Sequence, residues 1–281
     1  MLLNKLLKAI QPVQVTGESD IEITGINIDS RLVEAGQLFM AMRGTQADGH
    51  AYIPTAIEKG AVAVLCEDMP EEPVAGITYI QVKDSEDATG KIATTFYGDP
   101  TSKLELVGVT GTNGKTTTTT LLGEIMKAYQ DDVFVVGNIG NPYTVAADLM
   151  TEHSIAVAEM SSFQLESIVS FRPNVSAILN YTPDHLNRHH TMEAYIAAKE
   201  NIARNQTEDD YCVLNYEEPV MRKFAETLKC HVLFFSSQHK LEKGIYLDND
   251  KIIYKNPDEV EVCHVDELQI LGTHNYENVM A

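Results

Sequence analysis

The stretch GVTGTNGKTTTTTLL, residues 108–122, places two glycines and a lysine between an apolar run and five consecutive threonines. The apolar residues before it, 104–110, predict a β-strand, and residues 115–129 predict a helix. A strand followed by a glycine-rich turn and a helix is the layout of a phosphate-binding loop. This stretch therefore predicts a nucleotide-binding α/β domain around it.

Each residue of the loop has a chemical reason to be there. Gly111 and Gly114 let backbone N–H groups turn toward an anion, and the start of the helix adds its dipole. Lys115 would place its charge on the terminal phosphates, and Thr116 would offer its hydroxyl to Mg²⁺. The usual G-x-x-x-x-G-K-[ST] pattern is missed by one position, because Val109 stands where the first glycine belongs. The alternative is a glycine-rich turn that binds no ligand.

The composition of the 281 residues is that of a folded globular protein, with 44% hydrophobic and 22% charged residues. A net charge of −20 argues against a nucleic-acid partner, since phosphate-backbone binding needs clustered Lys and Arg. The four cysteines form no C-x-x-C pair, which is typical of reduced packing residues. No apolar run approaches the roughly 20 residues that span a bilayer, and we expect a cytoplasmic protein.

The chain predicts two α/β domains, residues 1–102 and 103–281. In the first, a short amphipathic helix begins the chain, and further strands and helices follow. The predicted strands cover residues 23–29, 37–42, 61–67 and 77–82, and the predicted helices cover residues 52–59 and 86–97. The turn residues at 98–102 predict a linker.

In the second domain strands and helices alternate, which favours a mostly parallel sheet flanked by helices. The strands expected after the loop cover residues 133–136, 155–158, 175–179, 211–214 and 232–235. Residues 245–254 break the alternation and predict a hairpin around residues 248–250.

Acidic and histidine side chains follow two of these strands. Glu159 comes directly after one, and Asp184 and His185 come shortly after the next. Ligands of open parallel sheets bind beyond the carboxyl ends of the strands, where Glu159 would be a metal ligand. Glu159 could instead be an acidic residue at a helix start, and a lone Asp-His pair is often only a hydrogen-bonded loop.

Lys199 lies on the apolar side of a predicted helix over residues 191–205. It is four residues after Tyr195 and three before Ile202, so it shares their face. A lysine that reaches back to solvent is one interpretation. Beside Mg²⁺ an ammonium would be repelled, so Lys199 would either face phosphate or become an anion, such as a carbamate formed with CO₂.

Taken together, these motifs resemble the Mur ligases, ATP-dependent enzymes that add amino acids to the peptidoglycan precursor. The resemblance rests on five segments in the family's order: GTNGKT, EMSSFQLE, NYTPDHLNRH, YIAAKENI and GTHNYENV. The family's loop also carries the shifted glycine. Two of the family's three domains are represented, and the chain stops shortly after the last motif.

The two domains resemble different members of the family. Residues 137–142 (GNIGNP) and 161–166 (SSFQLE) are similar to the ligases that add D-glutamate to UDP-N-acetylmuramoyl-L-alanine. Residues 29–57 are similar to the ligases that add lysine or diaminopimelate in the next step. The added amino acid is therefore D-glutamate in our first interpretation, and lysine or diaminopimelate in the second. A non-catalytic nucleotide-binding module is a third.

The resemblance implies a role for each matching position. The catalytic residues would be Lys115, Glu159, His185 and Lys199. ATP would be bound by Gly111, Thr112, Asn113, Gly114, Lys115, Thr116 and Thr117, with Asn275 and Asn278 near the adenine. The UDP precursor would be bound by Ser30, Thr45, Gln46, Asn138 and His185. One Mg²⁺ would be held by Thr116 and Glu159, and a second by His185 and carbamylated Lys199.

The implied reaction is an amide-bond ligation through an acyl phosphate, with ATP, two Mg²⁺ ions and a carbamate on Lys199 taking part. The partners would be the UDP-muramoyl precursor, ATP and an amino acid. We expect a monomer that, without the third domain, has negligible activity by itself.

Overall fold

The structure is a computed structural model that describes residues 1–43, 48–99, 103–139, 143–270 and 272–281. The chain divides into two compact units, Met1–Pro100 and Thr101–Ala281. Each unit has its own sheet and its own core, and each is described below by itself.

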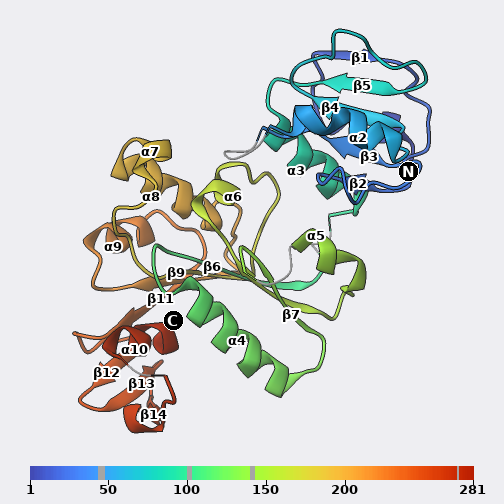
Figure 1. Ribbon diagram of the computed structural model, residues 1–281. Coiled ribbons are helices and arrows are strands. Elements are labelled where there is room, and N and C mark those ends of the chain that lie inside the picture. Colours follow the sequence, from blue (N-terminus) through green and yellow to red (C-terminus); the bar gives the residue numbers. More distant parts are fainter. Residues whose placement is uncertain (44–47, 100–102, 140–142, 271) are drawn as a thin grey trace. The chain divides into compact units, whose positions relative to one another are not determined.

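The first unit is built on a five-stranded sheet with the order β1-β5-β4-β3-β2 (Figure 1). The central pairs are parallel, and β1 is antiparallel to β5. The strands are β1 (Gln14–Thr16), β2 (Ile26–Asn27), β3 (Leu38–Met40), β4 (Ala63–Cys66) and β5 (Thr78–Gln81).

Helices cover both faces of this sheet because buried side chains alternate along the strands. Leu38, Leu65 and Ile80 pack in one cluster with residues of α1 (Leu3–Leu7) and α3 (Ser85–Phe96). Phe39 and Val64 pack in another with α2 (Ile53–Glu58), which follows η1 (Gly49–Tyr52). The amphipathic helix expected at the start of the chain is therefore present, although Leu2 lies outside it and is 40% exposed.

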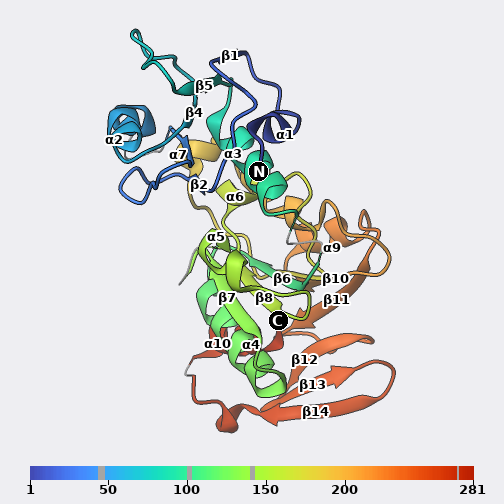
Figure 2. The ribbon, with the colours of Figure 1, turned by 90° about the vertical axis from the view of Figure 1, so that its right-hand side faces the viewer.

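The second unit is built on a nine-stranded sheet with the order β14-β13-β12-β11-β10-β9-β6-β8-β7 (Figures 1 and 2). Neighbours from β12 to β7 are parallel, whereas β13 and β14 are antiparallel additions. The strands are β6 (Glu105–Thr110), β7 (Val133–Gly137), β8 (Ile155–Glu159), β9 (Val175–Ile178), β10 (Tyr211–Asn215), β11 (His231–Ser236), β12 (Gly244–Asp248), β13 (Lys251–Lys255) and β14 (Glu259–His264).

Two groups of helices sandwich this sheet. One face carries α4 (Lys115–Tyr129), which contacts β6, β7 and β8, and α10 (Thr273–Met280), which packs beside α4. The other carries α6 (Ser162–Glu166), α8 (Met192–Glu200), η4 (Asn201–Ala203) and α9 (Pro219–Ala225), whose apolar residues share a cluster with Leu106, Ala156 and Leu214. The remaining helices are α5 (Tyr143–Ala146), η3 (Ala147–Leu149), α7 (Leu186–His189) and η5 (Val265–Glu267).

The architecture confirms the predicted fold class of two α/β sheets, the second mostly parallel and flanked by helices. The helix over residues 115–129 and the hairpin at 248–250 are where the sequence predicts them. The strand expected at residues 23–29 is wrong in length, because only Ile26 and Asn27 pair with β3. In the part of the chain that the structure describes, no helix is long and apolar enough to cross a membrane.

Candidate nucleotide-binding site

The loop between β6 and α4 turns at two glycines that have unusual backbone conformations. Gly111 has a φ of 150° and Gly114 a φ of 84°, which L-residues with side chains rarely adopt. Position 114 also has no room for a side chain, because a Cβ there would lie 2.1 Å from Oδ1 of Asn278. The glycine spacing thus allows both the turn and the close approach of α10.

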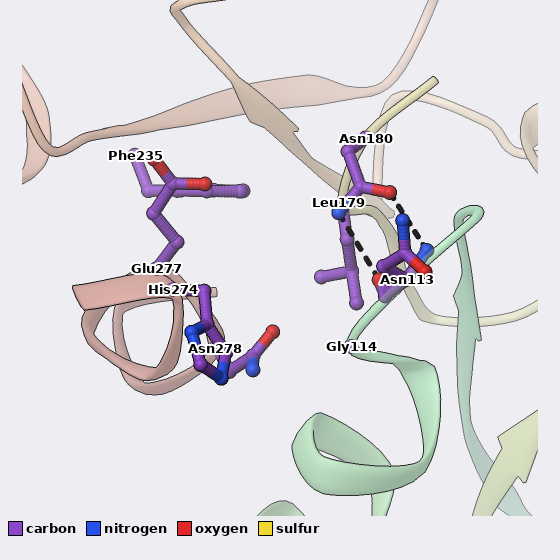
Figure 3. A pocket seen from close by; sticks show the side chains of 8 residues that line it. All are labelled: Asn113, Gly114, Leu179, Asn180, Phe235, His274, Glu277 and Asn278. Atoms are coloured by element: carbon purple, nitrogen blue, oxygen red, sulfur yellow. Dashed lines mark hydrogen bonds between the residues drawn. The ribbon is translucent and has the colours of Figure 1, made fainter. Parts of the chain in front are cut away.

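Asn180, just beyond the end of β9, holds the loop in place. Its Oδ1 accepts hydrogen bonds from the backbone N–H groups of Thr112 at 3.1 Å and Asn113 at 2.8 Å. Its Nδ2 donates to the carbonyl oxygen of Asn113 at 3.0 Å. Figure 3 shows the side chain of Asn180 facing Asn113. The loop is therefore fixed from the neighbouring strand before any ligand is considered.

Lys115 and Lys199 converge on the carbonyl oxygen of Gly111. Nζ of Lys115 donates to this oxygen at 2.9 Å and also to the carbonyl oxygen of Thr112 at 2.9 Å. Nζ of Lys199 donates to the same Gly111 oxygen at 2.7 Å and lies 4.6 Å from the ring centre of Tyr195. Lys199 is only 2% exposed, so the interpretation of a lysine that reaches back to solvent is wrong.

Burial lowers the pKa values of both lysines, and the charge of Lys115 lowers that of Lys199 further. Burial lowers the pKa of Lys115, against the opposing effects of Glu159 and Asp184. Burial, followed by the positive charge of Lys115, lowers the pKa of Lys199 from 10.5 to about 7, with Asp184 opposing. A substantial fraction of Lys199 is therefore a neutral amine near pH 7.

Thr116, Glu159 and Asn138 form a second polar group beside the loop. The hydroxyl of Thr116 donates to Oε2 of Glu159 at 2.9 Å, and Nδ2 of Asn138 donates to Oε1 at 3.0 Å. Glu159 ends β8 and is 2% exposed, so its carboxylate is aimed from the sheet at the start of α4. The alternative of an acidic residue at a helix start does not describe this side chain, because Glu159 belongs to β8 and α6 begins at Ser162.

His185 is less closely tied to this group. It adopts a φ of 51° at the start of α7, and its half-exposed side chain has Nε2 3.4 Å from Oδ2 of Asp184. Its ring lies edge-on to Phe163 of α6, with centroids 4.9 Å apart. His185 thus contacts Phe163 and Asp184. The contacts of the described residues include none between His185 and Lys199.

The residues expected near adenine lie on α10, and one of them, Asn278, lines a cavity of about 70 Å³ (Figure 3). Asn278 is 6% exposed and donates from Nδ2 to Oδ1 of Asn275 at 2.9 Å. Glu277 accepts from the hydroxyl of Ser237 at 2.6 Å and from Nδ2 of Asn215 at 3.3 Å. The cavity is lined by Asn113, Gly114, Leu179, Asn180, Phe235, His274, Glu277 and Asn278.

In the first unit, Ser30 is buried and lines a hollow of about 700 Å³ together with Asp29, Arg31 and Tyr52. Thr45 and Gln46, which the sequence also assigns to the precursor, lie outside the described residues. The same holds for residues 140–142 of the GNIGNP segment.

The side-chain oxygen and nitrogen atoms of the site indicate whether it could hold a magnesium ion. The hydroxyl of Thr116 and the carboxylate of Glu159 are oxygen ligands of the kind that Mg²⁺ takes alongside phosphate and water. Lys199 as a free amine does not suit a cation, whereas its carbamate would supply oxygen atoms. Among the described residues, no three His, Cys, Asp or Glu side chains gather closely enough to bind a metal by themselves.

Several residues of the site were not assigned a role from the sequence. Asn180 holds the loop through its side-chain amide. The hydroxyl groups of Tyr195 and Thr112 share a hydrogen bond at 3.0 Å, and the backbone N–H of Thr182 donates to the same Thr112 hydroxyl. The position of Asn180 at the end of a predicted strand was the available signal. The contacts of Tyr195 depend on how α8 crosses the loop, which the sequence pattern does not specify.

Comparison with known proteins assigns the chain to a family. Residues 109–281, more than half of the chain, match the Mur ligase middle domain. The chain belongs to the Mur ligase family. Residues 22–97 match a second domain of the same family, described as the Mur ligase catalytic domain.

Two curated relatives have different activities in their names. The chain is 60% identical over 181 residues to a UDP-N-acetylmuramoylalanine–D-glutamate ligase of Lachnoclostridium phytofermentans, a match that covers 64% of this chain and 40% of the relative. It is 53% identical over 240 residues to a UDP-N-acetylmuramoyl-L-alanyl-D-glutamate–2,6-diaminopimelate ligase of Bacteroides thetaiotaomicron, covering 78% and 50%. The chain thus matches half or less of the length of these Mur ligases.

A solved structure has the same fold. A MurF ligase from Thermotoga maritima, in complex with ADP, aligns with a TM-score of 0.64 and 24% identity. The alignment covers 91% of this chain and 61% of that ligase. At this identity the likeness supports the Mur ligase fold and nothing finer.

The low pKa of Lys199 predicts a pH-dependent contribution to stability. The folded chain loses this proton near pH 7, whereas the unfolded chain keeps it until about pH 10.5, so the unfolded chain binds more protons between these values. The quantity to compare is the free energy of unfolding of the wild type minus that of Lys199→Met, measured in CO₂-depleted buffer. This difference should rise with pH between about 7 and 10.5 and should not change with pH below about 7. Urea unfolding followed by circular dichroism measures this difference.

Lys127→Met is the matched control, because Lys127 lies near the exposed end of α4. Its difference from the wild type should not rise over the same range. A flat profile for Lys199→Met would show that the amine keeps its proton in the folded chain.

Proposed function

We propose that this chain holds the nucleotide-binding and precursor-binding parts of an ATP-dependent ligase that forms an amide bond on a UDP-muramoyl precursor of peptidoglycan in the cytoplasm. One observation carries the proposal: Lys115 and Lys199 meet at Gly111, and Thr116 and Glu159 meet beside them. The ammonium of Lys115, next to a hydroxyl–carboxylate pair, suits a triphosphate and its cation better than any uncharged ligand. Membership of the Mur ligase family supports it.

The reaction needs charge stabilisation rather than a side-chain nucleophile. A carboxylate is a poor electrophile, so ATP first phosphorylates it to an acyl phosphate. The amine of the incoming amino acid then attacks the acyl carbon, the C–O bond to phosphate breaks, and inorganic phosphate leaves. Lys115 and the loop N–H groups would bind and orient the phosphates, which places the transferring group against the carboxylate.

The metal sites are part of the proposal. Thr116 and Glu159 would hold one Mg²⁺, and His185 with carbamylated Lys199 would hold a second. When bound, the ions would supply positive charge against the transferring phosphoryl group.

Residues on other elements would bind the remaining parts of ATP and of the UDP precursor. Asn275 and Asn278 of α10 would lie near adenine, and Asn138, which bonds Glu159, would lie near the muramoyl-alanine end. Ser30, in the hollow of the first unit, would bind the uridine-diphosphate part together with Thr45 and Gln46.

The amino acid that we propose first is D-glutamate. The segments around Glu159 and residues 137–142 support it, and so does the 60% identity to the D-glutamate ligase of L. phytofermentans. Diaminopimelate or lysine is the second candidate, favoured by the similarity of residues 29–57 and by the longer match to the B. thetaiotaomicron ligase.

Removing the loop lysine should weaken nucleotide binding. Lys115→Ala deletes the charged hydrogen bonds that Nζ would make to phosphate, which are worth about 1.5–3 kcal/mol. We therefore expect the affinity of this chain for Mg–ATP to fall about 10- to 100-fold in isothermal titration calorimetry.

Lys127→Ala, at the far end of the same helix, should leave the affinity for Mg–ATP unchanged. Equal affinities of Lys115→Ala and the wild type would remove the loop from the proposed site.

Carbamylation of Lys199 should follow the protonation state of its amine. Only the neutral amine attacks CO₂, forming an N–C bond and releasing a proton, and the neutral form grows as pH rises through about 7. With ¹³C-bicarbonate, a carbamate carbon signal should therefore appear in NMR spectra of the wild type and increase from pH 6 to pH 8.

Lys199→Arg should lack the signal, because a guanidinium does not release its proton in this range. A wild-type spectrum without a carbamate signal at pH 8 would rule out the modification.

The added amino acid can be decided by phosphate release from ATP by the complete gene product. We expect turnover with UDP-N-acetylmuramoyl-L-alanine plus D-glutamate. Turnover only with the L-alanyl-D-glutamate precursor plus diaminopimelate or lysine would establish the second candidate instead. The 281-residue chain alone should bind ATP and the precursor with negligible turnover.

A further inference from the structure

A buried histidine, His189, joins two of the helices beside the proposed site. Its side chain is 1% exposed, with Nε2 2.9 Å from the hydroxyl oxygen of Ser162 and Nδ1 3.1 Å from Oε1 of Glu166. Ser162 begins α6 and Glu166 ends it, whereas His189 ends α7. Both α6 and α7 contact α8 (Figure 1).

One hydrogen bond and one close electrostatic contact hold the ring. Nε2 of His189 and the hydroxyl of Ser162 share a hydrogen bond, whose direction depends on the tautomer of the ring. Nδ1 lies 3.1 Å from Oε1 of Glu166, an ion-pair distance. Burial lowers the pKa of His189, with Glu166 opposing, and this favours the neutral ring.

The ring of His189 also belongs to a series of side-chain contacts that extends to the loop. It stacks on Phe163 of α6, with centroids 5.4 Å apart, and lies 5.3 Å from the ring of Tyr195 on α8. The hydroxyl of Tyr195 is 3.0 Å from that of Thr112 in the loop. The face of the same Tyr195 ring is 4.6 Å from Nζ of Lys199.

A serine, a histidine and a carboxylate in this order activate a nucleophile in many hydrolases. That role requires a substrate to reach the serine, and Ser162 is only 2% exposed. With the serine covered, the three residues can hold helices in place but cannot attack a substrate.

We propose that His189 is a positioning residue that holds α8, and with it Lys199, at a fixed place relative to α6. The ring of His189 contacts Tyr195 of α8 on one side and Ser162 and Phe163 of α6 on the other. Lys199 shares α8 with Tyr195 and lies over its ring. This inference rests on the proposed function, because that function assigns Lys199 to the magnesium–nucleotide site.

His189→Phe tests the role, because phenylalanine keeps an aromatic ring between Phe163 and Tyr195 and removes the hydrogen bond to Ser162 and the contact with Glu166. The readout is the ratio of the ATP affinity measured with Mg²⁺ to the affinity measured with EDTA. Loss of the buried hydrogen bond to Ser162 and of the contact with Glu166 should lower this ratio about tenfold, while the affinity in EDTA stays within about threefold of the wild type. A merely structural defect would lower both affinities together.

Three further variants separate positioning from charge and from folding. Glu166→Gln removes the charge beside Nδ1 but keeps the shape of the side chain and should retain the wild-type ratio, whereas Ser162→Ala loses the hydrogen bond to His189 and should lower it about threefold. His190→Asn is the control, because His190 is exposed and its φ of 66° suits asparagine. Ser162→Ala also serves as the test if His189→Phe does not fold, as judged by thermal unfolding.

An unchanged ratio in both His189→Phe and Ser162→Ala would overturn the positioning role and leave the proposed function intact. Labelling of Ser162 by a fluorophosphonate in the wild type, lost in His189→Phe, would overturn it in favour of a nucleophile. A wild-type chain that binds no ATP would overturn the proposed function and this inference with it.

Discussion

The carbonyl oxygen of Gly111 accepts hydrogen bonds from two lysines that lie 84 positions apart in the chain, Lys115 at 2.9 Å and Lys199 at 2.7 Å. Lys199 is buried, and the charge of Lys115 helps to lower its pKa. Bringing two ammonium groups to one oxygen is unfavourable unless an anion or a loss of charge relieves it. A bound triphosphate would provide the first, and a carbamate on Lys199 would provide the second. The rest of the site, from the glycine turn to the carboxylate of Glu159, is arranged around this constraint.

Much of the fold could be predicted because the hydrophobic pattern is regular. Buried strands such as β8 read as unbroken apolar runs, and α4 is bounded by Gly114 at its start. The pattern was less informative for β1 and β14, which are edge strands of the two sheets. Edge strands bury only part of their surface, so Val260 and Val262 in β14 alternate with glutamates and are exposed. Neither strand has the apolar run that marks a central one.

The candidate site was predictable where a residue's position along a strand determines where it lies. Glu159 follows directly from the end of a parallel strand, and Thr116 from the start of the helix after the loop. The helical spacing of its neighbours placed Lys199 on the apolar face of its helix, but it favoured a side chain that reaches back to solvent, which the burial of Lys199 contradicts. His189 was not predictable, because its partners Ser162 and Glu166 come from a different helix, and no periodicity in the sequence specifies how two short helices meet. The hydrogen bond from Asn138 to Glu159 likewise depends on the way the loop after β7 turns back.

The contact between Gly114 and Asn278 ties the first and last parts of the second unit together. A side chain at position 114 would overlap the amide of Asn278, so α10 can lie against the loop only because this residue is glycine. A truncated fragment ending after β14 would retain every strand of the nine-stranded sheet and lose the helix that lines one side of the cavity beside the turn. The extent of a fragment that keeps this cavity is consequently set by α10, not by the sheet from which the turn emerges.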